Sequence, residues 1–502
     1  MLEKPLFHET PAAQDSSLPA PIVRELSADL ETPVSVYLKL AGRGPSFLLE
    51  SVTGGEHLAR FSFIGVHSSR AYIMRGRSVE CRSANETTQL PVGPEGDPLD
   101  SLRAELARFR SAQVPGLPRF AGGLVGYLSY EMIRFFEPTV PVTPHSSLPD
   151  GIFLLTDTTV AFDHAFGRLL LIANVYPSDD PAAARAEAEA RLDEIQRCLA
   201  GPLPDLPRAG TRPASTDLRS NVTREQFIHS VETAKEHIAA GDIFQVVLSQ
   251  RLSRETSASP FAIYRALRRL NPSPYMFFFD FDGLAGTEDL YVIGASPELH
   301  VRLEGSRATV RPIAGTRPRG KSPADDLALE RDLLADPKEL AEHVMLMDLA
   351  RNDLGRVCEF GSVRVPEQMV VERYSHVMHI VSQVEGDLRS ELDAFDLVRA
   401  TFPAGTVSGA PKIRAMQIIH DLEPDPRGLY AGVVGYFASD GSMDTCITIR
   451  TLVMRGSTVS VQAGAGIVAD SDPEREYQET LNKARALAVA VEMAEKFGSE
   501  AK

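Results

Sequence analysis

The sequence has few cysteines, and they form no pair. Its four cysteines, Cys81, Cys198, Cys358 and Cys446, lie far apart and make no CxxC motif. Scattered thiols of this kind are typical of proteins in a reducing compartment. We therefore expect four reduced thiols, and we exclude a cysteine zinc site and a disulfide framework.

Positive charge is also in deficit. The 502 residues include 52 Lys and Arg against 68 Asp and Glu, which gives a net charge of −16. Nucleic acids and anionic membranes both require basic patches on the protein, so neither is expected as a partner. A small anionic substrate is still compatible with this balance, because a local group of Arg or Lys side chains can bind it.

Long hydrophobic runs and nucleotide motifs are missing as well. No run of about 18 apolar residues occurs, so no transmembrane helix is expected. The first residues, 1–5, show no basic region followed by an apolar core, so we read no signal peptide and expect a cytoplasmic protein. There is no GxxxxGK[ST] motif, no GxGxxG between a strand and a helix, and no short-period repeat.

The composition otherwise fits a large globular chain with two domains or two lobes. Residues 1–20 are rich in Pro, Ala and Ser, and we expect them to be disordered. Residues 21–200 form a β-rich N-terminal region, with strands predicted at 47–51, 61–65, 71–74 and 151–155 and a helix at 181–199. Residues 201–220 are expected to be a Pro-rich linker or surface loop.

The remaining region, 221–500, mixes helices and strands in runs. Helices are predicted at 223–240, 259–270, 324–353, 393–401 and 474–497. Strands are predicted at 243–252, 275–281, 291–296, 429–438, 444–454 and 458–463. Because strands and helices do not alternate strictly, an α+β fold with mixed, mainly antiparallel sheets is favoured over a Rossmann fold.

A constrained turn is predicted at 312–320, Pro-Ile-Ala-Gly-Thr-Arg-Pro-Arg-Gly. Its prolines fix φ and its glycines permit conformations closed to other residues. Arg311, Arg317 and Arg319 surround it with cations suited to a planar carboxylate. The turn is expected to bring backbone close to an anionic ligand.

Two helices carry paired carboxylates. Glu339 and Glu342 are three residues apart, as are Glu476 and Glu479, so each pair shares a helix face. Two such faces would suit a hard divalent cation, best Mg²⁺. The spacing fits solvated faces equally well, with Glu479 and Lys483 as an ordinary i,i+4 ion pair.

Other motifs are also open to a structural interpretation. His376 and His379 are either structural or catalytic, and the glycines of 462–466 either form a turn or offer N–H groups to an anion. The loop 402–412 is expected to lead into a helix at Lys412, whose N-terminus could attract negative charge.

Together these segments resemble the chorismate-utilising enzymes, and among them most closely the large subunits of anthranilate synthases. The resemblance covers nearly the whole chain and is strongest from 223 to 490. It is carried by segments in the order of the family. These are 242–251, 294–298, 312–320, 348–353, 375–379, 402–412, 449–451, 462–466 and 479–483.

The resemblance implies a fold and a chemistry. The fold would be a two-lobed sandwich of large, mainly antiparallel sheets with helices outside. The substrate would be chorismate and the cofactor Mg²⁺, bound by Glu342 and Glu479 with Glu339 and Glu476 nearby. Glu298 would be the general acid for the departing C4 hydroxyl, and His379 would assist the acid/base steps.

The resemblance also implies the rest of the site. Thr406 and Lys483 would complete the catalytic set. Substrate-binding residues would be Gly315, Thr316, Tyr430, Arg450, Gly464, Ala465 and Gly466. Feedback inhibition by L-tryptophan would use Ser51, Pro274, Tyr275 and Met276, although these segments could equally be core strand and loop.

Two positions discriminate among the related reactions. Isochorismate and salicylate synthases carry a lysine base where this chain has Gln245, and glutamine cannot deprotonate water. Many aminodeoxychorismate synthases carry a nucleophilic lysine where this chain has Ala314. Both differences favour ammonia adding at C2, with pyruvate elimination giving anthranilate, the first committed step of tryptophan biosynthesis. Aminodeoxychorismate synthesis for folate is the alternative, with isochorismate or salicylate synthesis less favoured.

The resemblance further implies a partner. Because the chain ends at Lys502, soon after the last motif, we expect a separate glutamine amidotransferase subunit and a hetero-oligomer. A non-catalytic tryptophan sensor is disfavoured, because Glu298, Glu342, His379 and Glu479 are all present.

Overall fold

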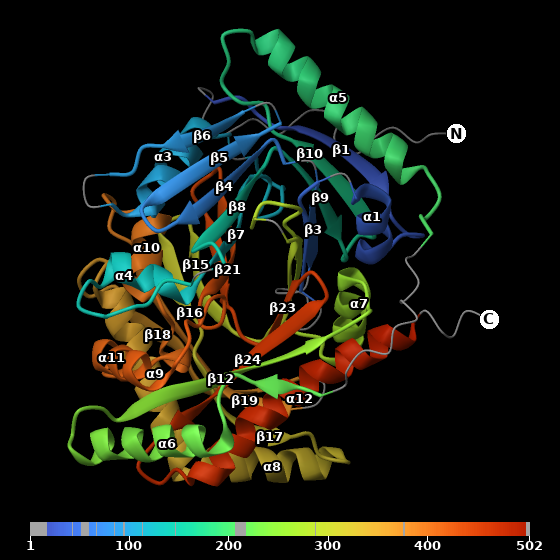
Figure 1. Cartoon of the computed structure of the whole chain (residues 1–502). Coiled ribbons are helices and arrows are strands. Elements are labelled where there is room, and N and C mark those ends of the chain that lie inside the picture. Colours follow the sequence, from blue (N-terminus) through green and yellow to red (C-terminus); the bar gives the residue numbers. More distant parts are fainter. Residues whose placement is uncertain are drawn as a thin grey trace.

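The computed structural model describes residues 18–497 except 43, 52–59, 67, 85, 94–95, 113, 146, 206–216, 287 and 375–376. The predictions for residues 1–17, for most of the linker and for His376 therefore lie outside the described residues. Two large sheets dominate the fold (Figure 1). Every strand pair in the described ranges is antiparallel, which confirms the predicted α+β class.

The first sheet joins the N-terminal and C-terminal parts of the chain, and blue and orange-red strands share it in Figure 1. In spatial order its strands are β1 (Ile22–Ser27), β10 (Arg168–Ala173), β9 (Thr158–Asp163), β3 (Phe61–Val66), β2 (Ser46–Glu50), β13 (Tyr275–Asp280), β14 (Leu290–Ser296), β23 (Thr451–Arg455), β24 (Thr458–Ile467), β12 (Gln245–Glu255) and β11 (Arg219–Ser220), with β20 (Gly409–Ala410) beside β12. Whether 21–200 and 221–500 are separate domains stays a prediction.

The second sheet is built in the same way from both parts of the chain. Its order is β17 (Ile313–Pro318), β19 (Val377–Asp387), β16 (Arg307–Val310), β15 (Leu299–Glu304), β22 (Met443–Ile447), β21 (Val433–Ala438), β7 (Gly123–Leu128), β8 (Gly151–Thr156), β4 (Arg70–Arg75), β5 (Ser78–Ser83) and β6 (Thr87–Leu90), with β18 (Arg364–Arg373) beside β19.

The two sheets pack on each other through their inner faces. Phe47 and Phe277 of the first sheet meet Val125 and Tyr436 of the second in one buried cluster. Strands buried on both faces read as continuous apolar runs, as in β8 and β13. Burial of this apolar surface is the main source of stability.

Helices cover the outer faces. They are α1 (Pro33–Leu40), α3 (Pro98–Arg108), α4 (Ile133–Phe136), α5 (Pro181–Leu199), α6 (Arg224–Ala239), α7 (Pro260–Leu270), α8 (Pro323–Ala335), α9 (Pro337–Gly355), α10 (Ala394–Thr401), α11 (Lys412–Leu422) and α12 (Pro473–Lys496). Among them, α1, α5, α7 and α12 pack on the first sheet, and α3, α9 and α10 on the second. None of the described helices is both long and apolar enough to cross a membrane.

Three predicted elements differ from those observed. The helix predicted at 324–353 is two helices, because Asp336 caps α9 through its side chain and Pro337 begins it. The strand predicted at 444–454 is also two, since Arg450 adopts a left-handed φ of 49° between β22 and β23. The segment 312–320 is mainly a strand, β17, at the end of its sheet.

The arginines around β17 were predicted to suit a planar carboxylate, and each of them pairs with a carboxylate of the protein itself. Arg311 pairs with Glu372 at 2.7 Å, Arg317 with Asp332 at 2.7 Å, and Arg319 with Asp326. They are bound to carboxylates of the protein, so they fasten the strand to α8 and β18. All four cysteines are free thiols, as predicted.

Candidate active site

Glu298 directly precedes β15 and is buried, with 4% of its surface exposed. The hydroxyl of Thr406, in the short 3-10 turn Gly405–Val407, donates a 2.7 Å hydrogen bond to its Oε1. Burial raises the pKa of Glu298 to about 7, while the bonds from Thr406 and the Ile313 backbone and the charge of Arg450 oppose this rise. The carboxyl group can therefore hold and donate a proton near neutral pH.

His379 lies on β19, opposite Thr316 of β17. Its Nδ1 is 3.0 Å from the carbonyl oxygen of Gly315 and 3.0 Å from the hydroxyl of Thr316. A carbonyl only accepts, so Nδ1 carries the proton and Nε2 is the free acceptor of the neutral ring. Burial lowers the pKa of His379, and nearby Arg450 lowers it further. The imidazole is thus a neutral base at pH 7.

Gly315 provides this carbonyl through a β-bulge. The pairing of β17 with β19 shifts register between Ala314 and Thr316, and Gly315 has a φ of +73°. Such a bulge re-aims neighbouring groups, and glycine enters this conformation without strain. A Cβ at this position would also lie 3.3 Å from Oε2 of Glu339. The bulge therefore places His379 and a carboxylate of α9 in one neighbourhood.

Four carboxylates of α9 and α12, Glu339, Glu342, Glu476 and Glu479, are linked by their charges. Burial raises the pKa of Glu342 on α9, and the charges of Glu339 and Glu479 raise it further. Burial also raises the pKa of Glu476 on α12, again with a contribution from Glu479. Charges on the two helices therefore interact, and the metal site suggested by the paired spacing stays a prediction.

Two of these carboxylates already have cationic partners. Glu339 is 3.2 Å from Arg317, and Glu479 is 2.7 Å from Lys483. Within the described residues, no three His, Cys, Asp or Glu side chains converge closely enough to hold a metal ion. The donor set nevertheless fits a hard cation in its chemistry, because it consists of oxygen ligands that repel one another.

Gln245, the first residue of β12, links the carboxylates to the sheet. Its Nε2 donates to Oε1 of Glu342 at 3.3 Å, whereas its own Oε1 is buried with no partner among the described residues. A Cβ on Gly466 of β24 would lie 2.5 Å from that Nε2. The glycine therefore leaves the room that the amide occupies, and the amide oxygen is free to accept a hydrogen bond.

The remaining predicted anchors lie along β24 and the nearby loops. A Cβ on Gly464 would lie 2.4 Å from the hydroxyl of Tyr430, so this strand position requires glycine. Lys483 of α12 donates to the Gly464 carbonyl at 2.9 Å. The side chain of Ala465 points to the opposite face, into the core beneath α6 and α11. Only its backbone can reach the site.

Arg450 supplies the cation of the site. It is half-buried and adopts a φ of +49° between β22 and β23. No carboxylate of the described residues lies within ion-pair distance of its guanidinium, yet its charge acts on both Glu298 and His379. A guanidinium without an anionic partner beside an acid and a base is suited to bind a substrate carboxylate.

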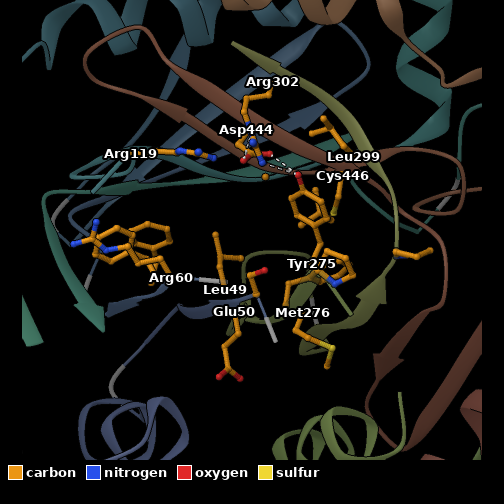
Figure 2. Close-up of a pocket in the computed structure, with 18 of the residues that line it drawn as sticks. Leu49, Glu50, Arg60, Arg119, Tyr275, Met276, Leu299, Arg302, Asp444 and Cys446 are labelled. Atoms are coloured by element: carbon orange, nitrogen blue, oxygen red, sulfur yellow. Dashed lines mark hydrogen bonds and ion pairs between the residues drawn. The ribbon is translucent and has the colours of Figure 1, made fainter. Parts of the chain in front are cut away.

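A separate cavity of about 880 Å³ lies between the sheets, and Ser51, Pro274, Tyr275 and Met276 all line it. Figure 2 shows Tyr275 next to Asp444, to which its hydroxyl donates at 3.1 Å, and Arg302 on the same carboxylate at 2.9 Å. The carboxylate of Glu50 points away from the cavity in Figure 2. It accepts a 2.9 Å hydrogen bond from Nε of Arg268.

This cavity shares a wall with the candidate active site. Pro297 and Leu299 line the cavity, while Glu298 between them accepts from Thr406 on the other side. Ile313 also lines the cavity, and its backbone bonds to Glu298. The ring of Tyr374, another lining residue, lies edge-on to His379 at 5.6 Å. A ligand in the cavity would therefore touch residues that hold the acid and the base.

Sequence reasoning missed these connecting residues. Ile313 acts through its backbone, which carries no residue-specific signal. Tyr374 is next to a recognised segment, so its proximity in sequence to His379 was the available signal. Asp444 lies on β22 and Arg302 on the neighbouring strand β15. Their contact depends on the register of these two strands, which places the two residues opposite each other.

Comparisons with known proteins agree with this geometry. The chain matches the chorismate binding enzyme family over residues 45–489. It is 48% identical to anthranilate synthase component 1 of Pseudomonas putida over 486 residues, 96% of this chain and 97% of the relative. It is 46% identical to the protein of the same name from Acinetobacter calcoaceticus, over 94% of this chain and 95% of the relative.

Solved structures give the same result. The crystal structure of anthranilate synthase component I from Streptococcus pneumoniae matches with a TM-score of 0.74 and 36% identity, over 92% of this chain and 99% of that one. The menaquinone-specific isochorismate synthase of Escherichia coli, at 21% identity, shares the fold with a TM-score of 0.69 over 94% of this chain and 96% of that one. The chain therefore belongs to the chorismate binding enzyme family, as an enzyme of the anthranilate synthase type.

Proposed function

We propose that this chain converts chorismate and ammonia into anthranilate and pyruvate, as the large component of a cytoplasmic anthranilate synthase. The observation that carries the proposal is the buried Glu298, whose pKa of about 7 lets it hold and release a proton near neutral pH. The charge of Arg450, which has no ion-pair partner among the described residues, acts on it. A reaction that expels a hydroxyl group from a ring bearing a carboxylate needs two groups. One is an acid that protonates the hydroxyl, and the other is a cation that binds the carboxylate.

The geometry supports an order of events. Arg450 binds a substrate carboxylate and fixes the ring. Ammonia attacks C2, the ring double bonds shift, and the C4–O bond breaks as Glu298 transfers its proton, so that water leaves. The added nitrogen then loses one proton, which restores the acid. In the second stage the C2 proton is removed, the C3–O bond breaks, and the enolpyruvyl CH2 carbon gains a proton. Pyruvate departs and the ring becomes aromatic. Nε2 of His379 is free to move a proton in these steps.

The nucleophile is proposed from what surrounds Gln245. This amide cannot act as a base, but its buried Oε1 lacks a donor within the described part of the chain. An ammonia molecule carries N–H donors that would satisfy it, which positions the nucleophile next to Glu342. Ala314, at 8% exposure, offers no amine that could attack the ring in place of ammonia.

We propose Mg²⁺ as the cofactor. Glu342 and Glu479 would hold it, with Glu339 and Glu476 nearby and further oxygens from water and substrate. When bound, the ion would neutralise the ring carboxylate and draw electron density from the diene. Burial raises the pKa of Glu342, and repulsion from Glu339 and Glu479 adds to the rise. This supports the assignment, because a bound cation would offset both effects.

A product assay on the purified chain tests the function. With chorismate, Mg²⁺ and a high concentration of ammonium at alkaline pH, we expect anthranilate by its fluorescence and pyruvate in equal amount. Glutamine should replace ammonium only after a separate amidotransferase subunit is added. Isochorismate, salicylate or aminodeoxychorismate by mass, or no product at all, would contradict the proposal.

We also propose that L-tryptophan inhibits the enzyme from the 880 Å³ cavity. The support is the shared wall, since residues that line the cavity also hold Glu298 and His379. The hydroxyl of Ser51 is buried without a partner among the described residues and could bond a ligand.

Substitutions at Ser51 test this assignment. Ser51→Ala removes an unsatisfied buried hydroxyl, so we expect unchanged or slightly higher stability and about tenfold weaker inhibition by tryptophan. Ser51→Leu, which also fills space, should weaken inhibition further. Rates at increasing tryptophan, each divided by the uninhibited rate of the same variant, provide the measurement. If Ser51→Leu leaves inhibition unchanged, the pocket is assigned wrongly.

A further inference from the structure

A second cavity, of about 290 Å³, lies against the first sheet where β12, β24 and β23 run side by side. Arg251, Ser460 and Arg455 line it, while the alternate residues Leu252 and Val461 pack into the core on the other face. Because successive side chains of a strand point to opposite faces, this cavity has a polar floor laid on a hydrophobic sheet.

The two arginines stand on opposite sides of the floor. Arg251 of β12 is in register with Gln462 of β24, and Arg455 of β23 is in register with Thr458 of the same strand. Ser460 lies between these two positions on β24. Arg251 and Arg455 therefore lie on either side of β24 and are offset along it, with Ser460 between them.

The balance of charge around this cavity is positive. No Asp or Glu of the described chain lines it. The counter-charges lie outside. Arg251 is 3.0 Å from Asp425 and Arg455 is 3.4 Å from Glu288, and those carboxylate side chains are 41% and 56% exposed. Exposed pairs of this kind contribute little free energy, so both guanidinium groups can bind another anion at small cost.

A third arginine is already committed. Arg427 lines the cavity but is buried against Glu423, to which its Nε donates at 2.8 Å. It also donates to the carbonyl oxygens of Val407 and Val247 at 2.8 Å and 2.7 Å. Of the three arginines, we therefore assign ligand binding to Arg251 and Arg455 only.

His145 also lines the cavity, and its neutral ring offers one N–H donor. Its Nδ1 accepts from the N–H groups of Ser147 and Leu148 at 3.2 and 3.1 Å, so Nε2 carries the proton. Burial lowers the pKa of His145 to about 4, and Arg251 and Arg455 lower it more than the neighbouring Asp425 and Asp150 raise it. The charges of the two arginines therefore outweigh those of Asp425 and Asp150 at this ring.

We propose that this cavity binds a small anion with several oxygens, a carboxylate or a phosphate compound, between Arg251 and Arg455. Planar, forked guanidinium groups suit such oxygens, and Nε2 of His145 adds an uncharged donor. The hydroxyl of Ser460 already donates to the carbonyl of Val453 at 3.3 Å, so it contributes polarity and not a donor. The volume is at the lower end for ligand sites, so the ligand has few heavy atoms. The site borders the chorismate pocket, because Tyr430 lines this cavity and its hydroxyl lies against Gly464.

Calorimetric titration of the full chain tests this proposal without enzymatic turnover. The probes are inorganic phosphate and malonate, each against chloride at equal ionic strength. We expect one site per chain for at least one probe. Arg251→Gln and Arg455→Gln should each weaken binding at least tenfold. Ser460→Leu should do the same by filling the cavity while both arginines remain, and a thermal melt without anion verifies that each variant is folded.

Two further variants locate the site. Arg450→Gln removes the cation of the chorismate pocket and should bind the probes as the unmodified chain does. Arg185→Gln, on the exposed face of α5 with 63% of its side chain accessible, controls for loss of one positive charge. The proposal is overturned if neither probe binds, if Arg450→Gln abolishes binding, or if the folded variants of Arg251, Arg455 and Ser460 bind normally.

Discussion

Glu298 couples the chemistry to the stability of the fold at the scale of one residue. Burial raises its pKa from 4.5 to about 7 in the folded chain, whereas an unfolded chain restores the ordinary value. The protonated form therefore favours the folded state below pH 4.5, and this contribution is lost as the pH rises through 7. The buried carboxyl therefore lowers the stability of the fold above neutral pH.

We predict that Glu298→Gln loses activity and gains stability. Removing the acid should lower kcat at least a hundredfold. Relative to the unmodified chain, the free energy of unfolding should rise with pH between 5 and 8, by up to about 3 kcal/mol at pH 8. Urea unfolding at both pH values measures this. A stability difference that does not depend on pH would contradict the raised pKa.

Thr406 tunes that acid. Its hydroxyl donates to the carboxylate form, which lowers the pKa of Glu298 against the effect of burial. In Thr406→Val this bond is lost and the pKa should rise, so activity should persist to higher pH before the acid is deprotonated. The pH profile of kcat/KM for chorismate at saturating ammonium measures the shift. Ser442→Ala, at a half-buried position between β21 and β22 where the hydroxyl donates to Asp440, should leave the profile unchanged.

Residue identities were predictable here, but their bonds were not. The acid, the base and the helix carboxylates have spacings or a family resemblance that single them out, as at Glu342 and Glu479. The bond from Ile313 to Glu298 depends on a backbone group, and the partners of Arg317 depend on where α8 and α9 pack. The sequence predicted three free arginines near β17 because it does not reveal these acidic neighbours.

At the scale of elements, the β-bulge in β17 determines where the base lies. We predict that Gly315→Ala reduces kcat/KM for chorismate at least tenfold, because the new Cβ would lie 3.1 Å from Leu333 and force a left-handed alanine. Gly305→Ala has a similar φ of +60° but no atom within 4 Å of its Cβ. Both should lose about 1–2 kcal/mol of stability.

Kinetics and unfolding measured on both variants separate the two effects. Only Gly315→Ala should lose activity, because its carbonyl bonds to His379. Equal activity in the two variants would mean that the bulge has no part in positioning the base.

Element boundaries were predictable where caps are local. The helix α5 begins at the predicted residue because Asp180 caps it and Pro181 is its first residue. Its last residue, Leu199, also matches the prediction. The division of 324–353 into α8 and α9 follows from the same rule at Asp336 and Pro337. The prediction missed this division because the helical periodicity of apolar residues continues across it. A strand at 313–318 escaped prediction because its pairing with β19 is nonlocal.

At the scale of the whole molecule, the sheets are built from strands distant in sequence. The strand β2 pairs with β13, and β7 pairs with β21, so the cavity between the sheets has walls from both halves of the chain. No local pattern specifies such pairings, which is why the sequence predicted strands and a class but not their order. Tryptophan bound in that cavity would contact both sheets at once.

This arrangement makes a prediction for the whole fold. Binding confined to the folded chain adds about 2.7 kcal/mol at a ligand concentration of 100 times Kd, so tryptophan should raise Tm. Val434→Phe places a larger side chain in the cavity from β21, where Val434 is 2% exposed. Because Val434 is already packed in the buried cluster between the sheets, the larger ring should lower the Tm of the free chain by the equivalent of about 1–3 kcal/mol. It should also remove the tryptophan-dependent rise. Thermal melts with and without tryptophan measure both effects. A Val434→Phe chain that is still stabilised by tryptophan would place the inhibitor outside the space between the sheets.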